Sequence, residues 1–171
     1  MINIVLYEPE IPQNTGNIMR TCAGTYAKLH LIGPLGFRLD EKSLKRSGVN
    51  YIEHCDYVLY DDYEDFLDKN KDGDFYYLTR YGKKPHTDFD FTDPKQERNI
   101  YLVFGKESTG IPKEILSKHL DRCLRIPTND NIRALNLSNC VALVLFEVLR
   151  QQDYPNLSKT EPFKGEDYLE K

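Results

Sequence analysis

The chain has 171 residues, of which 40% are hydrophobic and 29% are charged, so it can bury one sizeable core in a single domain. The N-terminus shows neither the basic region nor the apolar block of a signal peptide. The longest uninterrupted apolar run, Cys140–Phe146, is far shorter than the roughly 20 residues that cross a bilayer. We therefore expect a soluble, cytoplasmic protein without a membrane partner.

The net charge of −4 argues against a protein that is basic overall, but the charge is unevenly distributed. Asp56–Asp74 holds eight acidic and two basic residues, and the tail from Asp153 adds further negative charge. The remainder is positive and could receive an anionic partner on one face, unless the acidic block is simply a solvated helix and loop. No CxxC spacing occurs, so we expect reduced thiols and no metal site. The four cysteines are Cys22, Cys55, Cys123 and Cys140.

The first element is predicted to be a buried strand, because Ile2–Tyr7 is an apolar run of strand length that the following prolines end. A helix follows to about Ala27, with Asn14 or Thr15 able to cap its first turn. This helix begins just beyond a strand end, where open α/β sheets hold ligands. Arg20 is therefore either a site residue or an ordinary solvated arginine on a surface helix.

Strands alternate with helices through the middle of the chain, which predicts a parallel sheet. Lys28–Ile32, Tyr57–Tyr60 and Phe75–Thr79 have the pattern of strands, and an acidic helix is expected over Tyr63–Lys69. Asp40–Ser47 is helical in pattern. Its three basic residues, Lys42, Lys45 and Arg46, share a face that either contacts phosphate or is solvated.

A glycine-containing loop follows the clearest strand, Ile100–Phe104, and leads to a helix that uses Pro112 in its first turn. This loop, Gly105–Gly110, does not have the spacing of a Walker A motif, and Glu107 puts a negative charge where phosphate would lie. A small cationic or zwitterionic cofactor fits it better than a nucleoside triphosphate. The earlier basic loop, residues 80–86, either meets phosphate or is an ordinary charged loop.

The last strand, Arg122–Ile126, leads into a polar loop and then into the most apolar helix of the chain. The loop Thr128–Ala134 is rich in Asn and Asp, which tolerate unusual backbone angles. The helix from Leu135 to about Gln152 is apolar on nearly every side and therefore needs cover on every side, which favours a homodimer. We expect a binding site at the junction of loop and helix.

Three blocks of this sequence resemble the three motifs of the SPOUT RNA methyltransferases. They are Asn14–Arg20 (NTGNIMR), Leu102–Pro112 (LVFGKESTGIP), and Ile126–Pro127 together with Asn136–Asn139 (NLSN). The opening IVLYEPEIPQNTGNIMR narrows the resemblance to the TrmL (YibK) branch, whose members methylate the ribose 2′-hydroxyl of the wobble nucleotide, cytidine or uridine, in leucine tRNAs. The resemblance extends from Met1 to about Pro155.

The resemblance implies an α/β fold in which a mostly parallel sheet is flanked by helices and the C-terminal segment forms a deep trefoil knot. The methyltransferase domain would cover residues 1–155, and residues 156–171 would be a C-terminal tail. The cofactor would be S-adenosylmethionine, bound without a metal. Two subunits of a homodimer would complete each active site, and the RNA partner would be the anticodon stem-loop of a tRNA. The implied cofactor contacts fall at Leu78, Thr79, Gly105, Ile126, Ala134 and Leu135.

The family assigns a central role to the arginine of the first motif, here Arg20. Because the pKa of a guanidinium exceeds about 12, we expect Arg20 to orient the target phosphate, which could relay the hydroxyl proton, rather than to act as the base. Methyl transfer to another tRNA position or to rRNA, and a noncatalytic RNA-binding module, are the alternatives. The other implied catalytic residues could instead be caps or braces; they are Asn14, Asn17, Glu107, Ser138 and Asn139.

Overall fold

The computed structural model describes residues 1–40, 42 and 52–171. In these residues, seven strands form one sheet in the order β3-β2-β1-β6-β4-β7-β5, and all paired strands are parallel. The α/β fold with a parallel sheet between helices is confirmed. The strands are β1 (Ile2–Tyr7), β2 (Lys28–Ile32), β3 (Tyr57–Tyr60), β4 (Asp74–Leu78), β5 (Lys84–Pro85), β6 (Ile100–Phe104) and β7 (Cys123–Arg125).

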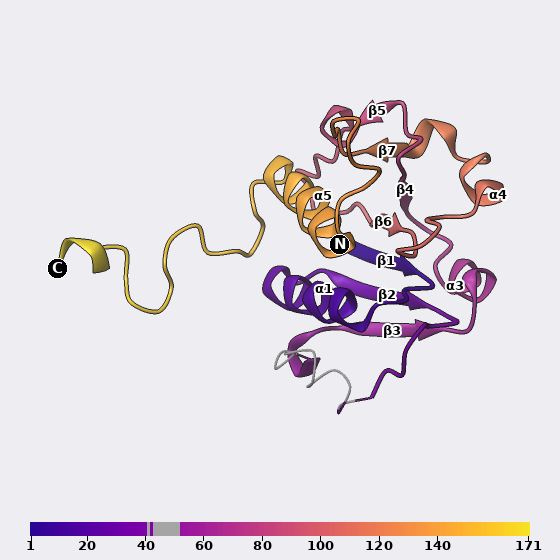
Figure 1. Cartoon of the computed structure of the whole chain (residues 1–171). Coiled ribbons are helices and arrows are strands. Elements are labelled where there is room, and N and C mark those ends of the chain that lie inside the picture. The colour runs from indigo at the N-terminus through magenta and orange to yellow at the C-terminus, as the bar shows by residue number, and fades with distance from the viewer. Residues whose placement is uncertain (41, 43–51) are drawn as a thin grey trace.

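Helices cover both faces of the sheet (Figure 1). The long helices α1 (Pro12–Thr25) and α5 (Leu137–Gln151) lie side by side on one face, and α3 (Tyr63–Lys69) and α4 (Lys113–Leu116) lie on the other. Each face has its own hydrophobic core, with Leu29 and Val144 buried on the α1 and α5 side and Phe66 and Val103 buried on the opposite side. Short 3₁₀ turns occur at Ile52–His54, His86–Asp88, Leu120–Arg122 and Tyr168–Glu170.

Most of the predicted strands have the predicted bounds, because each is a continuous apolar run that the sheet buries. The last strand is shorter than expected, at Cys123–Arg125. The basic loop contains a strand that the sequence did not predict: β5 pairs with β7 through Lys84 and Pro85. Two residues are too few to show a period, and proline is tolerated there because β5 is the edge strand. The helix expected over Asp40–Ser47 lies outside the described residues.

The predicted cap of α1 was wrong. Ile11 occupies the N-cap position without a side-chain cap, and Pro12 begins the helix. Asn14 and Thr15 therefore lie inside the first turn, where both are buried. The proline sets this start, because its fixed φ suits the first helical position. Pro112 shows the opposite shift, since it is the N-cap of α4 rather than a residue of its first turn.

The chain stops packing against the core soon after α5. Tyr154 and Leu157 still pack against the core on the α5 side, whereas residues 158–171 are exposed and extend away from the sheet (Figure 1). The helix itself is less enclosed than its composition predicted, because Leu143 and Phe146 are each 46% exposed. The knotted path of the C-terminal segment stays a prediction. No helix in the described part of the chain is long and apolar enough to span a membrane.

Candidate active site at the C-terminal ends of the strands

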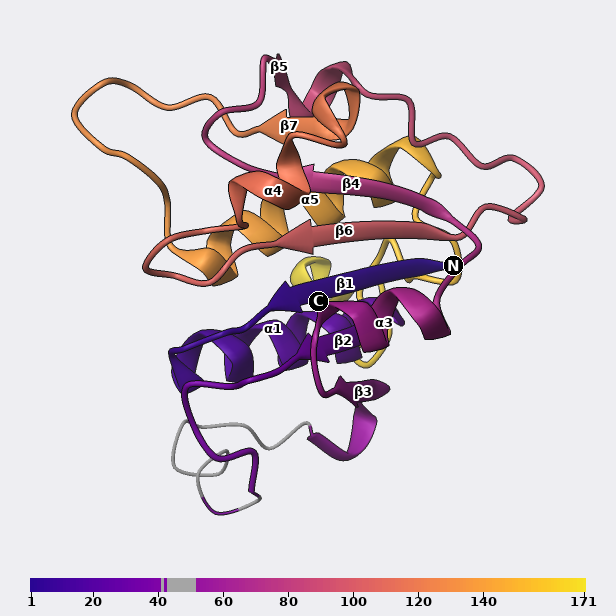
Figure 2. The ribbon, with the colours of Figure 1, turned by 90° about the vertical axis from the view of Figure 1, so that its right-hand side faces the viewer.

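A pocket of about 710 Å³ lies beyond the C-terminal ends of β4, β6 and β7. The strand arrows in Figure 2 point toward this edge, and the loops that follow them extend beyond it. In a parallel sheet this is the edge where ligands bind. The pocket is formed by three segments that are distant in sequence, residues 78–81, 104–111 and 125–140, with Ile11 and Asn14 of the first motif beside them.

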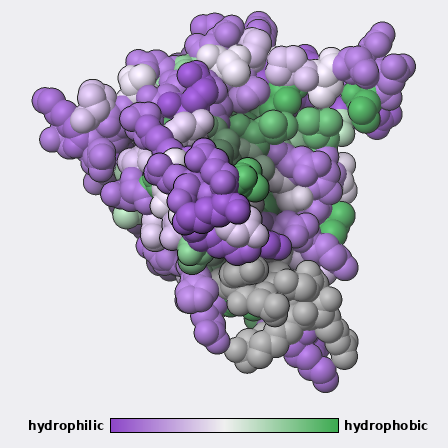
Figure 3. All heavy atoms as spheres, turned by 90° about the vertical axis from the view of Figure 1, so that its left-hand side faces the viewer, coloured by the Kyte–Doolittle hydropathy of each residue, from purple (hydrophilic) through white to green (hydrophobic). Residues whose placement is uncertain are grey.

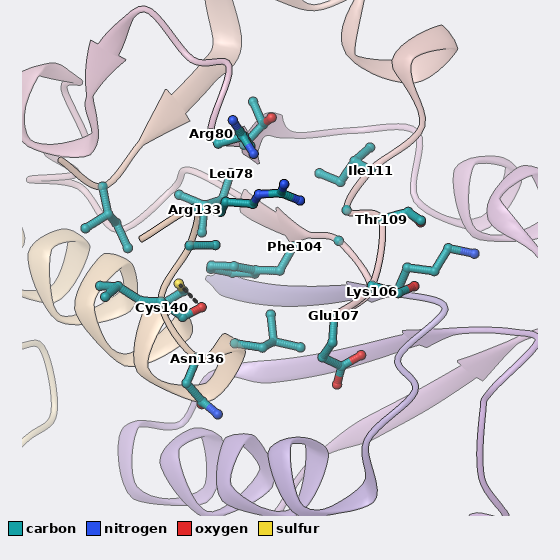
Figure 4. Close-up of a pocket in the computed structure, with 18 of the residues that line it drawn as sticks. Leu78, Arg80, Phe104, Lys106, Glu107, Thr109, Ile111, Arg133, Asn136 and Cys140 are labelled. Atoms are coloured by element: carbon teal, nitrogen blue, oxygen red, sulfur yellow. Dashed lines mark hydrogen bonds between the residues drawn. The ribbon is translucent and has the colours of Figure 1, made fainter. Parts of the chain in front are cut away.

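All six residues predicted to contact the cofactor line this pocket. Leu78 and Thr79 come from the end of β4, Gly105 follows β6, and Ile126 follows β7. The remaining two, Ala134 and Leu135, immediately precede α5. Figure 4 shows Leu78 and Phe104 on the pocket wall. The structure thus brings the predicted set together, while its role in binding a cofactor stays a prediction.

The backbone of the loop Gly105–Gly110 folds back tightly on itself. Lys106 and Gly110 form an isolated antiparallel bridge, and the Gly110 amide donates to the Lys106 carbonyl at 2.9 Å. A Cβ on Gly105 would collide with the carbonyl carbon of Gly110, and Gly110 has a φ of +73°. Only glycine fits both positions without strain. The loop therefore exposes its backbone to the pocket.

Glu107 joins this loop to the start of α1. Its two carboxylate oxygens accept hydrogen bonds from the backbone amides of Glu10 at 2.8 Å and Ile11 at 3.1 Å, and from the side-chain amide of Asn14 at 3.3 Å. A carboxylate at this place also faces the positive end of the helix dipole. The sequence predicted that Glu107 is either a catalytic residue or a brace of its loop, and the observed contacts are those of a residue that holds a loop.

 Two acidic residues after β1, Glu8 and Glu10, form matching contacts with the loop after β6. We call these contacts, together with those of Glu107, the interlock. Glu10 accepts hydrogen bonds from the backbone amide of Ser108 at 3.1 Å and from its hydroxyl at 2.6 Å, which hold the pKa of the Glu10 carboxyl below its usual value. Lys106 donates to Glu8 at 2.6 Å, and this bond raises the pKa of the lysine. Both loops are therefore fixed relative to each other before any ligand binds.

Asn136 connects α5 to this interlock. Its side-chain oxygen caps α5 by accepting from the backbone amides of Ser138 at 2.9 Å and Asn139 at 3.4 Å, and it also accepts from the Ser138 hydroxyl at 2.5 Å. Its amide nitrogen donates to Asn14 at 3.0 Å. A chain of side-chain bonds thus runs from Asn136 through Asn14 to Glu107 and ties two helices to the loop.

The other predicted catalytic residues do not line the pocket of a single chain. Arg20 and Asn17 are exposed on α1, and Asn139 is exposed on α5. Ser138 is half-buried and engaged with Asn136. Of the predicted catalytic set, only Asn14 and Glu107 border the cavity, so one chain presents an incomplete version of the predicted site.

A family model described as the SpoU rRNA methylase family matches residues 1–146. The chain belongs to this family. A protein of Geobacillus stearothermophilus, provisionally named a tRNA (cytidine(34)-2′-O)-methyltransferase, is 52% identical over 92% of this chain and 99% of its own length. The Escherichia coli K12 protein named tRNA (cytidine(34)-2′-O)-methyltransferase is 42% identical over 91% of this chain and 96% of its own.

A solved structure described as giving insights into the 2-OH methylation of C/U34 on tRNA has the same fold. It is 38% identical to this chain, covers 88% of it and 95% of that chain, and superposes with a TM-score of 0.79. The family predicted from the three sequence blocks is therefore confirmed. The pocket described above is formed by the same blocks and the ends of the adjoining strands.

Three arginines of this pocket are absent from the predicted set of site residues, although the sequence raised Arg80 as part of the basic loop 80–86 that either meets phosphate or is an ordinary charged loop. The three are Arg80, Arg125 and Arg133. Within the described residues, none of their side chains forms an ion pair or donates a hydrogen bond to an acceptor. Figure 4 shows Arg80 and Arg133 approaching the cavity from different loops. Their shared position after strands, or in the loop before α5, was the available signal, but isolated arginines on loops are too common to select them.

Cys140 also borders the pocket, where its thiol donates to the Leu135 carbonyl at 3.6 Å (Figure 4). Burial raises the pKa of this thiol, so it remains protonated near neutral pH. All four cysteines are free and buried, as expected for reduced thiols. Across residues 1–40, 42 and 52–171, no group of three or more His, Cys, Asp or Glu side chains is placed to hold a metal ion.

Proposed function

We propose that this protein transfers a methyl group from S-adenosylmethionine to the ribose 2′-hydroxyl of the wobble nucleotide, cytidine or uridine, in the anticodon loop of leucine tRNAs. The observation that carries this proposal is the pocket in which the three family motifs meet at the C-terminal edge of the sheet. The names of relatives that match nearly the whole chain support the wobble position. The sequence resemblance supports the choice of leucine tRNAs, and the cysteine spacing supports a cytoplasmic location.

The residues of the pocket fit the proposed methyl donor. Leu78, Ile126 and Leu135 supply apolar walls for an adenine ring, and the volume lies within the usual range for small-molecule sites. At Gly105 the absence of a side chain lets a ligand approach the backbone amides and carbonyls. When bound, S-adenosylmethionine supplies an electrophilic methyl group on a positively charged sulfur. Lys106, which lines the pocket beside Glu107, is paired with Glu8.

The chain's own contribution is mainly positioning. A bound donor would give up its methyl group by breaking the bond from that carbon to sulfur and would leave as S-adenosylhomocysteine. The chain must therefore hold the 2′-hydroxyl close to the methyl group while the hydroxyl proton passes to an acceptor such as the target phosphate. Asn14 and Glu107 stand at the pocket and are fixed by Asn136 and by backbone amides, so they can hold the loop walls still while the ribose docks. We assign Arg20 to the target phosphate, which it would orient as a donor of several hydrogen bonds.

A homodimer would bring Arg20 of the partner subunit to this pocket. The exposed face of α5 carries Asn139, Leu143 and Phe146 at helical spacing, and α1 with its exposed Arg20 packs beside α5. Figure 3 views this side of the molecule and shows apolar patches among polar surface. Burying two large apolar side chains on each subunit would stabilise the pair by a few kcal/mol at about 25 cal/mol per Å².

Incubating the purified protein with labelled S-adenosylmethionine and unmodified tRNAs tests the function. We expect label in leucine tRNAs, at the wobble ribose, and none in a tRNA mixture from which leucine tRNAs are removed. Transfer to rRNA alone, or binding of tRNA without transfer, would contradict the proposal.

The role of Arg20 is tested by Arg20→Lys and Arg20→Ala. Both variants should lose methyl transfer by about 100-fold or more, because a lysine cannot form the two parallel bonds of a guanidinium. Cofactor affinity, measured by calorimetry, should stay within about twofold of the parent. Loss of cofactor affinity would show that the role is misassigned.

The dimer is tested by sedimentation at micromolar concentration. We expect a dimer for the parent chain and a monomer for Leu143→Asp, which places a charge on the exposed face of α5. A substitution on the opposite side of the molecule, Leu67→Asp on α3, is the matched control and should leave the dimer intact. A monomeric parent would refute the interface.

A further inference from the structure

The turn after β4 presents an exposed aromatic side chain at the rim of the pocket. Tyr81 lines the cavity and is 74% exposed. The turn is firmly placed: the Thr79 amide donates to the Leu124 carbonyl at 3.0 Å, and the Gly82 amide donates to the Thr79 carbonyl at 3.2 Å. Gly82 is buried, and a Cβ there would lie 2.8 Å from the Leu124 carbonyl carbon, so the turn rests directly on β7. Tyr81 is therefore held outward by a rigid support.

Arg80 lies over one face of this ring, so the two side chains form a stack at the rim. The carbon at the centre of its guanidinium lies 5.3 Å from the centroid of the Tyr81 ring. No ion pair of Arg80 is present among the described residues, so no carboxylate explains its position. Aromatic rings and guanidinium planes are the surfaces on which proteins stack unpaired RNA bases.

The charge around this surface suits RNA. Arg125 and Arg133 line the same pocket, and Arg133 extends into it from the loop before α5 (Figure 4). The acidic side chain on the lining, Glu107, is already engaged with three hydrogen-bond donors. The rim is thus locally positive on a chain whose net charge is −4. Such a rim attracts a phosphodiester backbone.

We propose that Arg80 and Tyr81 form a stacking platform for the base of the nucleotide whose ribose is methylated. This inference rests on the proposed function. The base and the 2′-hydroxyl are attached to adjacent carbons of the ribose, so a ribose that places its hydroxyl in the pocket must place its base at the wall or rim. Stacking there would hold the nucleotide out of the anticodon stack, and it would tolerate either pyrimidine because every base offers a flat face.

The adenine of the cofactor is the competing occupant of the platform. Its expected contacts are the apolar side chains Leu78, Ile126 and Leu135, which lie deeper than the exposed Tyr81. The two occupants make different predictions: stacking of the target base affects the KM for tRNA, whereas stacking of adenine affects the affinity for S-adenosylhomocysteine.

The test uses the full chain and a leucine tRNA with 2-aminopurine at the wobble position, whose fluorescence is quenched when the base stacks. Tyr81→Leu should raise the KM for unmodified tRNA roughly 10-fold and make the bound 2-aminopurine brighter than in the complex of the parent protein, while Tyr81→Phe should keep most of the affinity and of the quenching in the complex. The affinity for S-adenosylhomocysteine should be unchanged in both variants. Tyr168→Leu is the matched control, because Tyr168 is also exposed beneath a cation, Lys164, but lies in the C-terminal tail away from the pocket.

Unchanged KM and quenching in a folded Tyr81→Leu protein would overturn the platform, and so would a weakened affinity for S-adenosylhomocysteine with an unchanged KM for tRNA. Equal effects of Tyr81→Leu and Tyr168→Leu would overturn it as well, because they would show a general effect on RNA binding. A parent protein that methylates tRNA while Tyr81→Leu behaves identically refutes only this inference. A parent that methylates no tRNA refutes the proposed function itself.

Discussion

The pocket loops at the C-terminal ends of the strands are joined by charged side chains, whereas the face of the sheet under α3 contains a closed ring of neutral hydrogen bonds. Each donor in the ring is satisfied by the next acceptor, with distances of 2.7 to 3.2 Å. The order is His30, Asn3, Asn99, Tyr101, Asn70, Tyr60 and back to His30.

The direction of the ring assigns the proton of His30. The Asn3 side-chain oxygen accepts from Nε2 at 2.9 Å, so Nδ1 is the acceptor for the Tyr60 hydroxyl at 2.8 Å. A protonated imidazole could not accept this bond. The pocket interlock differs, because Glu8, Glu10 and Glu107 are partly exposed and use charge. The ring therefore stabilises the sheet, and the interlock places the loops that line the pocket.

Among changes to the pocket loops, Gly105→Ala should lower the unfolding free energy most. The new Cβ would collide with the backbone of Gly110, so the loop must open and the unfolding free energy should fall by about 3 kcal/mol. Affinity for S-adenosylhomocysteine should fall in parallel. Gly24→Ala is the control, because a Cβ there meets nothing within 4 Å and alanine favours the helix. Equal stability of the two variants in urea would contradict the close approach.

Acid should instead destabilise the fold through the hydrogen-bonded ring that contains His30. Burial lowers the pKa of His30 from 6.5 to about 4, so the unfolded chain binds this proton first as the pH falls. The unfolding free energy should consequently fall by roughly 3 kcal/mol between about pH 6.5 and pH 4, and should be fully retained above pH 6.5. His30→Gln should lack this part of the pH dependence. Parallel curves for the two proteins would show that His30 does not control it.

Glu107→Gln tests how much the charged contacts between the pocket loops contribute to stability. Glutamine has one acceptor oxygen, so it cannot serve both the Glu10 and the Ile11 amides, and it removes the charge facing α1. We expect a loss of about 2 kcal/mol in unfolding free energy and slower methyl transfer. Glu97→Gln, on an exposed loop, should change neither by a measurable amount.

The Glu8 and Lys106 pair should matter least. Both side chains are partly exposed, at 22% and 27%, and exposed ion pairs contribute about 0.5 kcal/mol. Glu8→Gln and Lys106→Met should each be mild, and the double variant should show a coupling of similar size that decreases in high salt. Coupling above about 2 kcal/mol would mean that the pair, rather than Glu107, holds the loops.

The sequence predicted the sheet well because its strands are continuous apolar runs. The family resemblance, rather than any pattern of residues, implied the cofactor set; its members line one pocket, and their role in binding a cofactor stays a prediction. The sequence could not predict that Glu10 would bond Ser108, or that Asn136 would bond Asn14, because these partners are nearly 100 or more residues apart and polar side chains carry no periodic signal. The ring around His30 was missed for the same reason.

The most direct test of the proposed function removes the 2′-oxygen that would accept the methyl group. Leucine tRNA carrying cytidine at position 34 is compared with the same tRNA carrying 2′-deoxycytidine there, using labelled S-adenosylmethionine and the unmodified chain. We predict one methyl group per cytidine tRNA, recovered as 2′-O-methylcytidine, and none on the deoxycytidine tRNA. Equal labelling of both tRNAs would contradict transfer to the wobble ribose.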